Sequence, residues 1–430
     1  MQGQGLPGFR DFYPEELALR NYIFATWRDV ARRYGFQEYD GPPLEPRELY
    51  EQKSGAEIVE QLYWFEDKGN RRVALRPEMT PTLARMVGAR AQALKKPIRW
   101  FSIPQLFRYE RQQRGRLREH FQLNMDILGE AGPLADAELI AAAIDIMRAF
   151  GFGPGDVKLR VSDRRVLRAL LTAVGLREEQ LGLAYWAIDK IDRISRTDLE
   201  KELITKWALT ADQDVAKRVL AIAEVRGETA LRAHLREARA EPEAEALFEC
   251  VAALGAMGLS EFVEIDLSIV RGLAYYTGIV FEVFDSGKAL RAICGGGRYD
   301  GLLKALGGTD LPALGFGMGD VVLGELLRER KSPFEAPAQL DAFLVAVSGE
   351  DIGPVLKLAH DLRDRGVAVE YGLRHAAIRK QLELAAARGA PRAVIVGPDE
   401  RAAGEVVVRD LKAGREEKVS VARLLEGSFR

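Results

Sequence analysis

Two neighbouring segments between Leu106 and Leu128 carry the residues whose types and spacing are best suited to chemistry. We expect two antiparallel strands joined by a charged loop. Because successive side chains of a strand point to opposite faces, the polar residues of the pair gather on one face: Arg108, Glu110, His120, Gln122, Asn124 and Asp126. The other face of the second strand is apolar, with Phe121, Leu123, Met125 and Ile127. A face that combines a guanidinium, carboxylates, amides and an imidazole is predicted to line a site rather than to pack as core.

The loop between these strands is rich in arginine, with Arg111, Arg114, Arg116 and Arg118 around Gly115. Guanidinium groups bind phosphate oxygens well, so such a loop suits a mobile polyanion, either a nucleotide phosphate or an RNA end. The alternative is a solvated hairpin with ordinary surface charge. The arginine loop and the polar row together favour a nucleotide site.

Two later segments form a second group of candidate residues. One contains Arg271, Tyr275 and Tyr276, which places a fixed cation beside two phenols, and the other begins with three consecutive glycines at 295–297. Glycine has no Cβ, so the backbone can approach another group closely there. The alternative, which fits either segment alone equally well, is a glycine hairpin with the tyrosines in the core.

The stretch from Arg76 to Thr80 joins a predicted strand to a predicted helix. Thr80 is expected to cap the helix Pro81–Arg90, with Pro81 at its first position. Glu78 would then lie in the field of the helix N-terminus. This structural interpretation accounts for Thr80 and Pro81 but leaves Arg76 and Glu78 without a role.

The pattern of apolar residues divides the chain into several domains. An amphipathic helix is predicted to begin at Pro14, and residues 163–258 are almost purely helical in pattern. Residues 331–337 contain two prolines and are expected to be a linker. Residues 338–430 then alternate strands and helices, which predicts a small, parallel-type α/β domain. The helical stretch is interpreted as an insertion in a domain formed by residues 1–162 and 259–330.

The bulk composition of the 430 residues is that of an ordinary globular protein. A formal net charge of −2 excludes a broadly basic RNA-binding surface, so any nucleic acid must be met by a local patch. The two cysteines and four scattered histidines predict neither a disulfide framework nor a metal site. Neither a signal peptide nor a bilayer-spanning apolar run is evident, so we expect no membrane partner and a cytoplasmic location.

Several of these segments resemble the signature motifs of a known family. Arg108-Tyr109-Glu110, the arginine loop and Gln122 resemble the second motif of class II aminoacyl-tRNA synthetases. The Arg271 segment and the 295–301 glycine segment closely match the two histidine-specific motifs of the histidyl branch. The resemblance implies an α+β catalytic domain with a mixed, mostly antiparallel sheet and a helical insertion, followed by a C-terminal anticodon-binding-like α/β domain. It also implies a homodimer formed through the first domain, where the N-terminal helix is followed by Pro42-Pro43.

The resemblance further implies activation of histidine with ATP, accompanied by Mg²⁺, and transfer to histidine tRNA. The two catalytic cations would be Arg108 and Arg271. The residues implied in histidine binding are Glu78, Met79, Thr80, Arg108, Gln122, Asp126, Arg271, Tyr275 and Tyr276. The residues implied in ATP binding are Arg108, Glu110, Arg116 and His120, and no protein-bound metal is expected.

The chain departs from the family pattern at three positions. Val321-Val322 stands where the third motif normally has Glu-Arg, so the ATP-binding arginine of that motif is absent. Ala274 replaces an aspartate, and His120 replaces a phenylalanine that packs on adenine. These departures leave a second interpretation, a catalytically silent relative that serves as a histidine-sensing regulatory subunit of ATP phosphoribosyltransferase. The C-terminal domain argues against it, because such regulators usually lack one.

Overall fold

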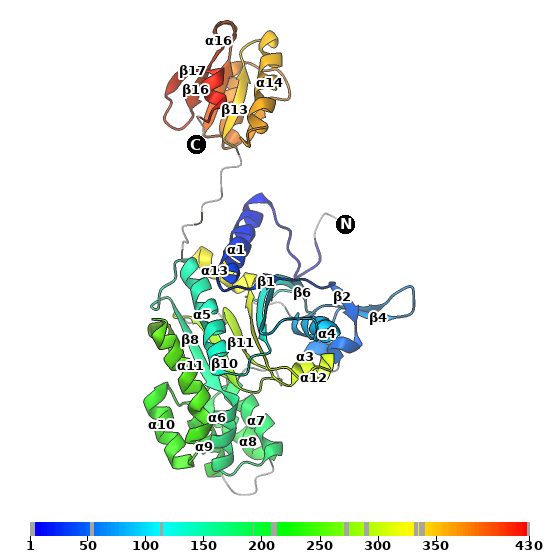
Figure 1. Cartoon of the computed structure of the whole chain (residues 1–430), viewed down its shortest axis with the longest axis vertical. Coiled ribbons are helices and arrows are strands. Elements are labelled where there is room, and N and C mark those ends of the chain that lie inside the picture. Colours follow the sequence, from blue (N-terminus) through cyan, green and yellow to red (C-terminus); the bar gives the residue numbers. More distant parts are fainter. Residues whose placement is uncertain are drawn as a thin grey trace. The chain divides into compact units, whose positions relative to one another are not determined.

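The computed structural model describes residues 5–51, 56–111, 115–191, 193–207, 213–270, 275–287, 292–330, 334 and 340–427. The chain divides into two compact units, Met1–Phe334 and Glu335–Arg430, and Figure 1 draws both with labels on those helices and strands for which there is room. None of the described helices is long and apolar enough to cross a membrane.

A large mixed sheet organises the first unit. Among the described residues its strand order is β1-β5-β7-β12-β11-β10-β8-β9, with β6 also paired to β7, and most pairs are antiparallel. The strands are β1 (Gln37–Glu38), β5 (Ile98–Ser102), β6 (Gln105–Phe107), β7 (Glu119–Leu128), β8 (Val157–Asp163), β9 (Val263–Ile265), β10 (Ile279–Asp285), β11 (Cys294–Arg298) and β12 (Ala313–Gly319). The predicted mixed, mostly antiparallel sheet is therefore confirmed.

One face of this sheet packs against helices α1 (Pro14–Arg33), α5 (Pro133–Ala149) and α13 (Asp320–Glu329). Leu123, Met125 and Ile127 of β7 point into that core, as the alternation predicts. The opposite face packs partly against α4 (Thr80–Arg90) and α12 (Leu302–Gly307), which contact each other. The even-numbered residues of β7 lie on this second face, so their polar groups are free of the main core.

A run of helices follows β8 and shares the main core with the sheet. It comprises α6 (Arg164–Ala173), α7 (Glu178–Asp189), α8 (Arg196–Trp207), α9 (Gln213–Ala223), α10 (Gly227–Ala238) and α11 (Glu245–Ala256). Asp163 caps α6 by accepting a hydrogen bond from the backbone N–H of Arg165 at 2.8 Å, as expected. In Figure 1, α11 runs beside α5, and the helices α6 to α10 gather at one end of the sheet.

A small second sheet lies beside α4, with strand order β2-β4-β3. Its strands are β2 (Leu44–Pro46), β4 (Arg72–Leu75) and β3 (Trp64–Glu66), and the short helices α2 (Glu48–Glu51) and α3 (Ala56–Glu60) connect them. The chain leaves β4 directly into the segment Arg76–Met79. This sheet therefore sets where Glu78 and Thr80 stand at the start of α4.

The second unit is a five-stranded sheet in the order β14-β13-β15-β16-β17. Strand β13 (Ala342–Ala346) pairs in parallel with β14 (Val369–Tyr371) and β15 (Arg392–Val396), while β16 (Glu405–Asp410) and β17 (Glu416–Ser420) continue antiparallel. Helices α14 (Ile352–Arg363) and α15 (Ile378–Ala387) contribute to separate apolar cores that contain alternate residues of β13. The short helices α16 (Pro398–Ala403) and α17 (Val421–Leu425) flank the last strands.

Several predicted elements need correction. Arg108, Tyr109 and Glu110 lie beyond the end of β6 and are not part of a strand. Thr80 is the first residue of α4 and does not cap it, because Met79 holds the N-cap position without a side-chain hydrogen bond. The helices α8 and α10 fall within the stretch predicted to be helical, whereas the strands β16 and β17 were not predicted from the sequence.

Candidate active site

A cavity of about 290 Å³ lies on the second face of the large sheet. Residues from the start of α4, the strands β7, β11 and β12, and the Tyr275-Tyr276 segment converge on it. The lining includes Glu78, Thr80, Arg108, Glu110, Arg116, Gln122, Asn124, Asp126, Tyr275, Tyr276 and Tyr299. Most of the side chains that the sequence analysis singled out therefore meet in one place, although they are far apart along the chain.

Glycines on β12 make room for the polar side chains of β7. Gly315 is the register partner of Asp126, and a Cβ added to it would lie only 2.0 Å from an Asp126 carboxylate oxygen. At Gly317 a Cβ would lie 2.7 Å from the Gln122 side-chain amide. Both side chains can thus lie across the neighbouring strand and form the floor of the cavity.

Asp126 sits at the bottom of the cavity as a buried acid. The hydroxyl of Tyr299 donates a hydrogen bond to its carboxylate. Burial raises the pKa of Asp126 to about 7, although the Tyr299 hydrogen bond lowers it. The carboxyl therefore titrates near neutrality and can switch between accepting and donating a hydrogen bond.

Glu78 and Tyr275 form another polar pair in the cavity. Glu78 is buried, and the Tyr275 hydroxyl donates to its carboxylate over 3.5 Å. The ring centroid of Tyr275 lies 5.1 Å from that of Tyr276 and 5.9 Å from that of Tyr299. A carboxylate and a phenol offer an acceptor and a donor together, which is what a planar ring with both N–H and N requires.

Arg108, Glu110 and Arg116 connect this cavity to an adjoining hollow of about 120 Å³. Arg108 is held by donating to the Pro77 carbonyl at 2.9 Å, and the Glu110 carboxylate lies 2.9 Å from the Arg116 guanidinium. Arg116 is exposed, so its cation remains open to an incoming ligand. The two arginines place positive charge where the cavity and the hollow meet, which suits a phosphate group.

His120 lines the adjoining hollow together with Gly319, Val321 and Val322. Burial lowers the pKa of His120 to about 3, and the charges of Arg108 and Arg10 lower it further. The imidazole is therefore neutral at physiological pH. A neutral, flat ring beside the apolar side chains of Val321 and Val322 can stack on an adenine.

The position of the missing third-motif arginine is filled by apolar packing. The Val322 side chain is buried, and a Cβ added to Gly115 would lie 3.3 Å from its Cγ2 atom. Val322 therefore lies next to Gly115 of the arginine-rich loop and presents an apolar side chain where the family motif has a cation. Next to it, Asp320 accepts a hydrogen bond from the Phe121 N–H at 2.9 Å and pairs with Arg10.

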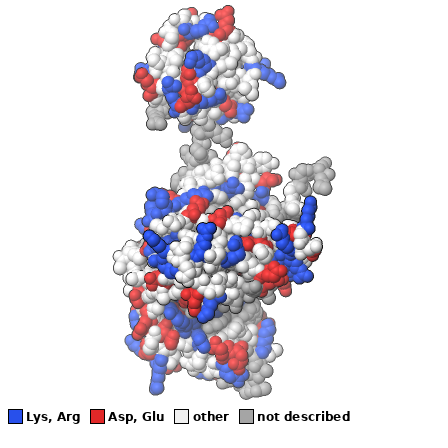
Figure 2. All heavy atoms as spheres, turned by 45° about the vertical axis from the view of Figure 1, so that its right-hand side comes forward, with Lys and Arg blue, Asp and Glu red and all other residues white. Residues whose placement is uncertain are grey.

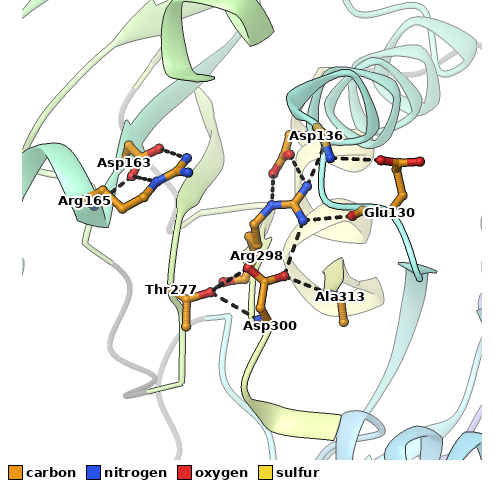
Figure 3. A network of polar contacts seen from close by, with 9 residues as sticks. Glu130, Asp136, Asp163, Arg165, Thr277, Arg298, Asp300 and Ala313 are labelled. Carbon is orange, nitrogen blue, oxygen red and sulfur yellow. Dashed lines mark hydrogen bonds and ion pairs between the residues drawn. The ribbon is translucent and has the colours of Figure 1, made fainter. Parts of the chain in front are cut away.

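A buried arginine ties the glycine strand to its surroundings (Figure 3). Arg298, at the end of β11, pairs with Asp136 of α5 and donates to the Glu130 carbonyl at 2.9 Å. Its Nη1 atom also lies 3.3 Å from Asp300, whose carboxylate accepts from the Ala313 N–H at 3.0 Å. Burial raises the pKa of Asp136 to about 6 against the opposing effect of Arg298. This network fixes β11 against β12 and so sets the position of the cavity floor.

Two predicted site residues are placed neither in the cavity nor in the adjoining hollow. The Met79 side chain is almost fully buried and contacts Arg76, so it supports the segment that carries Glu78 rather than lining the site. Arg271 lies outside the described residues, as does Ala274. Arg76 is also structural, since its guanidinium pairs with Asp40 and donates to the Gly41 and Gln105 carbonyls.

The sequence analysis missed several residues of the cavity wall. Asn124 was placed on the polar face of β7 by the sequence analysis but was given no binding role, and it lines the cavity between Gln122 and Asp126. Tyr299 lies two residues after the last of the three glycines, but nothing in the sequence links it to Asp126. Ile58 and Gln61 come from the chain just before β3, and no local pattern marks them.

Comparisons with known proteins agree with this geometry. The family described as histidyl-tRNA synthetase matches residues 8–319, and an anticodon binding domain matches residues 341–427. The chain is 46% identical over 419 residues to a histidine–tRNA ligase of Opitutus terrae, covering 97% of this chain and 95% of that one. It is 42% identical to the chloroplastic/mitochondrial histidine–tRNA ligase of Arabidopsis thaliana, covering 97% of this chain and 85% of that one. A crystal structure of histidyl-tRNA synthetase from Nostoc sp. superposes with a TM-score of 0.83 at 27% identity, covering 99% and 98% of the two chains.

Proposed function

The chain belongs to the histidyl-tRNA synthetase family, and we propose that it is a histidine–tRNA ligase that activates histidine with ATP and charges histidine tRNA. The observation that carries this proposal is the convergence of Glu78, Arg108, Asp126 and Tyr275 on one cavity of the matched domain. The buried polar residues of the cavity suit an amino acid. Arg108 and Arg116, where the cavity meets the hollow, suit phosphate groups.

The reaction proceeds in two steps at this site. The carboxylate of histidine attacks the α-phosphorus of ATP, the bond to the pyrophosphate oxygen breaks, and histidyl-adenylate forms. A hydroxyl of the terminal tRNA ribose then attacks the activated carbonyl, and AMP leaves. The first step gathers negative charge around phosphorus, so correctly placed cations contribute most to its rate.

We assign the cations Arg108 and Arg271 to that step. Arg108 faces the cavity with its guanidinium oriented by the Pro77 carbonyl, which supports a role in holding the histidine carboxylate and the α-phosphate. Arg116 and Glu110 border the adjoining hollow, which supports contact with a distal phosphate and with the adenine amine. His120 completes the adenine side as a neutral stacking ring.

The amino-acid end is assigned to acids, phenols and amides. Glu78 and Tyr275 offer an acceptor and a donor to the substrate, and Asp126 offers a second acid whose state Tyr299 adjusts. Thr80, Gln122 and Tyr276 line the same space. These assignments are supported by position and by chemistry.

Magnesium is proposed to arrive with ATP as part of the substrate. Among the described residues, no group of three or more His, Cys, Asp or Glu side chains could hold a metal ion. Glu110 is the acidic residue that lines both the cavity and the hollow. Its carboxylate is already paired with Arg116. The phosphates of ATP would therefore be the main ligands of the ion.

We propose that the protein is a homodimer through its first unit. Trp64 and Phe65 of β3 are each 49% exposed, and Leu44 of β2 is 37% exposed, so the small sheet presents apolar surface. A groove of about 620 Å³ lies along the same sheet. Exposed aromatic side chains next to a groove are typical of an interface. Light scattering that gives a monomer at micromolar concentration would contradict this part of the proposal.

The regulatory-subunit interpretation is favoured by one observation, the apolar packing of Val322 in place of an arginine. It predicts a protein that binds histidine but carries out no chemistry. The anticodon-domain match at 341–427 speaks against it, because a histidine sensor has no use for such a domain.

ATP–pyrophosphate exchange, with and without histidine, separates the two interpretations. A ligase exchanges pyrophosphate only when histidine is present, and other amino acids serve as controls. A chain ending near Pro337 should still exchange but should charge tRNA poorly, chiefly through a raised KM for tRNA. Histidine binding without exchange, together with a lack of tRNA binding, would establish the regulatory function instead.

A further inference from the structure

Charged side chains of both signs are intermixed over the face that Figure 2 draws. Asp266, which directly follows β9, is unlike a surface charge because its side chain is fully buried. Taking a carboxylate out of water is costly unless it is paired and hydrogen-bonded, so the contacts of Asp266 must offset that cost. The chain continues from Asp266 to Tyr275 and Tyr276, which line the cavity.

The closest cation to Asp266 comes from the run of helices α6 to α11. Arg226 lies between α9 and α10, and its guanidinium is 2.8 Å from the Asp266 carboxylate. The same guanidinium donates to the carbonyls of Ala223 at 2.7 Å and of Val225 at 3.1 Å, so the end of α9 fixes it in place. The Val225 carbonyl also accepts from the Leu267 N–H at 3.2 Å. The helical run is thus joined to the segment after β9.

A second arginine approaches Asp266 from the large sheet. Arg160 of β8 lies 3.4 Å from the Asp266 carboxylate and 3.7 Å from Glu264, so its charge is divided between two acids. Among the described residues, Asp266 is the only acid that pairs with Arg226. Burial raises the pKa of Asp266, and of the two guanidinium groups Arg226 opposes this rise more strongly. Arg226 is therefore the main cationic partner of the buried acid.

The Asp266 side chain also shapes the backbone that follows it. Its carboxylate accepts from the Ser268 N–H at 2.8 Å and from the Ser268 hydroxyl at 2.6 Å, and its carbonyl accepts from the Ile269 N–H at 3.2 Å. The turn places Ile269 in the apolar cluster that contains Tyr276, and Tyr275 packs against the same cluster. The contacts of Asp266 therefore support the tyrosine side of the cavity.

The chain after the two tyrosines is attached to the helical run as well. The N–H of Arg164, the first residue of α6, donates to the Gly278 carbonyl at 3.0 Å. The Thr277 N–H donates to the Arg298 carbonyl at 2.8 Å, and the Thr277 hydroxyl accepts from the Asp300 N–H at 3.2 Å, within the network of Figure 3. Along the chain, the two tyrosines therefore lie between two attachments to the helical run.

We propose that Arg226 is a positioning residue for the histidine site and acts through Asp266 on Tyr275 and Tyr276, an inference that rests on the proposed function. The helical run then takes part in the activation of the amino acid, although none of its described residues lines the cavity. The adenine side depends on β7 and the arginine-rich loop instead. Loss of Arg226 should therefore affect histidine and ATP unequally.

The test measures the two substrates separately in variants of the full chain. Arg226→Met keeps an unbranched side chain and removes the charge, and the side chain it replaces is 34% exposed. It should raise the KM for histidine in pyrophosphate exchange, and the calorimetric Kd for histidine, about tenfold, the scale on which small misplacements of a site act. The KM for ATP should change much less. Arg226→Lys, which keeps a cation, should recover part of the loss, and Asp266→Asn should resemble Arg226→Met.

Two control variants lie in the same run of helices. Arg232→Met removes a charge from α10 that is paired with Glu228 at 2.6 Å. Leu203→Ala removes a fully buried side chain from α8, which packs on α7 and α9, and so weakens the run away from Asp266. Both controls should keep the original KM for histidine. If Leu203→Ala raises it as much as Arg226→Met does, the run contributes only general stability and Arg226 is not a positioning residue.

A double-mutant cycle shows whether Arg226 acts through the tyrosines. Tyr275→Ala alone should weaken histidine binding. Adding Arg226→Met to Tyr275→Ala should cost clearly less than Arg226→Met costs in the original protein, because residues that act as one unit do not have additive effects. Fully additive losses in the calorimetric Kd would show that Arg226 does not act through Tyr275, and would overturn the proposal.

Other outcomes separate the role of Arg226 from the proposed function. If the original protein binds histidine and exchanges pyrophosphate, but Arg226→Met retains the original KM and Kd for histidine, the ligase function stands and Arg226 has no positioning role. If the KM values for histidine and ATP rise equally, Arg226 is structural only. If the original protein neither binds histidine nor exchanges pyrophosphate, the proposed function fails, and the role of Arg226 fails with it.

Discussion

The guanidinium of Arg10 and the carboxylate of Asp320 lie 2.9 Å apart and join the beginning of the chain to the start of α13. Arg10 also pairs with Glu119 of β7 at 2.6 Å, and both carboxylates are almost fully buried. The Gly8 carbonyl accepts from the N–H groups of Arg118 and Glu119 as well. Residues 8–10 thus hold β7, the strand that carries His120, in place. They do so next to Val322, which stands where the family motif has an arginine.

We expect Arg10→Ala to destabilise the protein and to weaken ATP binding. Removing the cation leaves Glu119 and Asp320 buried without their partner, which typically costs about 3–5 kcal/mol. Urea unfolding measures this loss, and Arg10→Lys, which keeps one charge, should show a smaller one. The KM for ATP should rise more than the KM for histidine, because the brace lies at the adenine end. Equal increases in both constants would show that Arg10 contributes only to general stability.

Gly315→Ala should abolish histidine activation without unfolding the protein. The new methyl group would lie 2.0 Å from the Asp126 carboxylate, so either the side chain or β12 must move. Histidine-dependent pyrophosphate exchange measures the effect, and circular dichroism reports the fold. Gly182→Ala in α7 is the control, since a Cβ there meets nothing within 4 Å. Normal exchange by Gly315→Ala would remove Asp126 from the histidine site.

The pH dependence of histidine binding should report the titration of Asp126. Its pKa of about 7 means that the carboxyl loses its proton near neutrality, so the KM for histidine should change across that range. Tyr299→Phe removes a hydrogen bond that lowers this pKa, and the midpoint of the change should therefore move to higher pH. A midpoint that is identical in both proteins would exclude control of Asp126 by Tyr299.

The same raised pKa values predict how stability depends on pH. Asp126 and Asp136 hold their protons in the folded protein up to about 7 and about 6, whereas an unfolded carboxyl releases its proton near 3.8. Between these values the folded state binds more protons, so these two groups lower the free energy of unfolding as pH rises. Their contribution should level off only when the pH is well above 7, where Asp126 is fully deprotonated in both states.

The sequence predicted those parts of the site that depend on local alternation. The polar and apolar faces of β7 follow from the period of two in a strand, and both are confirmed by the core and the cavity. The glycines of β11 were correctly predicted to permit close approach, whereas the same role of Gly315 and Gly317 in β12 was not predicted. The family assignment is confirmed as well, because its motifs preserve spacing within short segments.

Contacts between distant segments were beyond sequence reasoning. Arg10 meets Asp320 across almost the whole first unit, and Tyr299 meets Asp126 from another strand. Thr80 was wrongly assigned as a cap because Thr-Pro fits that pattern equally well one residue earlier or later. The helices α8 and α10 lie in the stretch predicted to be helical, but their bounds were not predicted. The hairpin of β16 and β17 was missed, and β17 is strongly polar in sequence.

Arg298→Met should destabilise the protein strongly, while the double variant Arg298→Met with Asp136→Leu should be much less affected. The single change leaves a buried carboxylate without its cation, at a typical cost of about 3–5 kcal/mol, whereas an apolar pair of similar size is close to neutral. Urea unfolding of the single and double variants measures the difference. A double variant that is as unstable as the single one would show that the carbonyl contacts of Arg298 matter more than its ion pair.

Arg271→Ala is expected to reduce the rate of histidine activation by about a hundredfold or more. Arg271 precedes a glycine in the segment that carries Tyr275 and Tyr276, and the loss of one correctly placed donor to a transition state has this magnitude. Because the effect belongs to the transition state, histidine binding measured by calorimetry should change much less than the rate. Arg193→Ala, in the helical segment far along the chain from the cavity residues, serves as the charge-matched control. If Arg271→Ala exchanges pyrophosphate at the original rate, Arg271 is not a catalytic residue. Of the two cations assigned to the step, Arg108 alone would then remain.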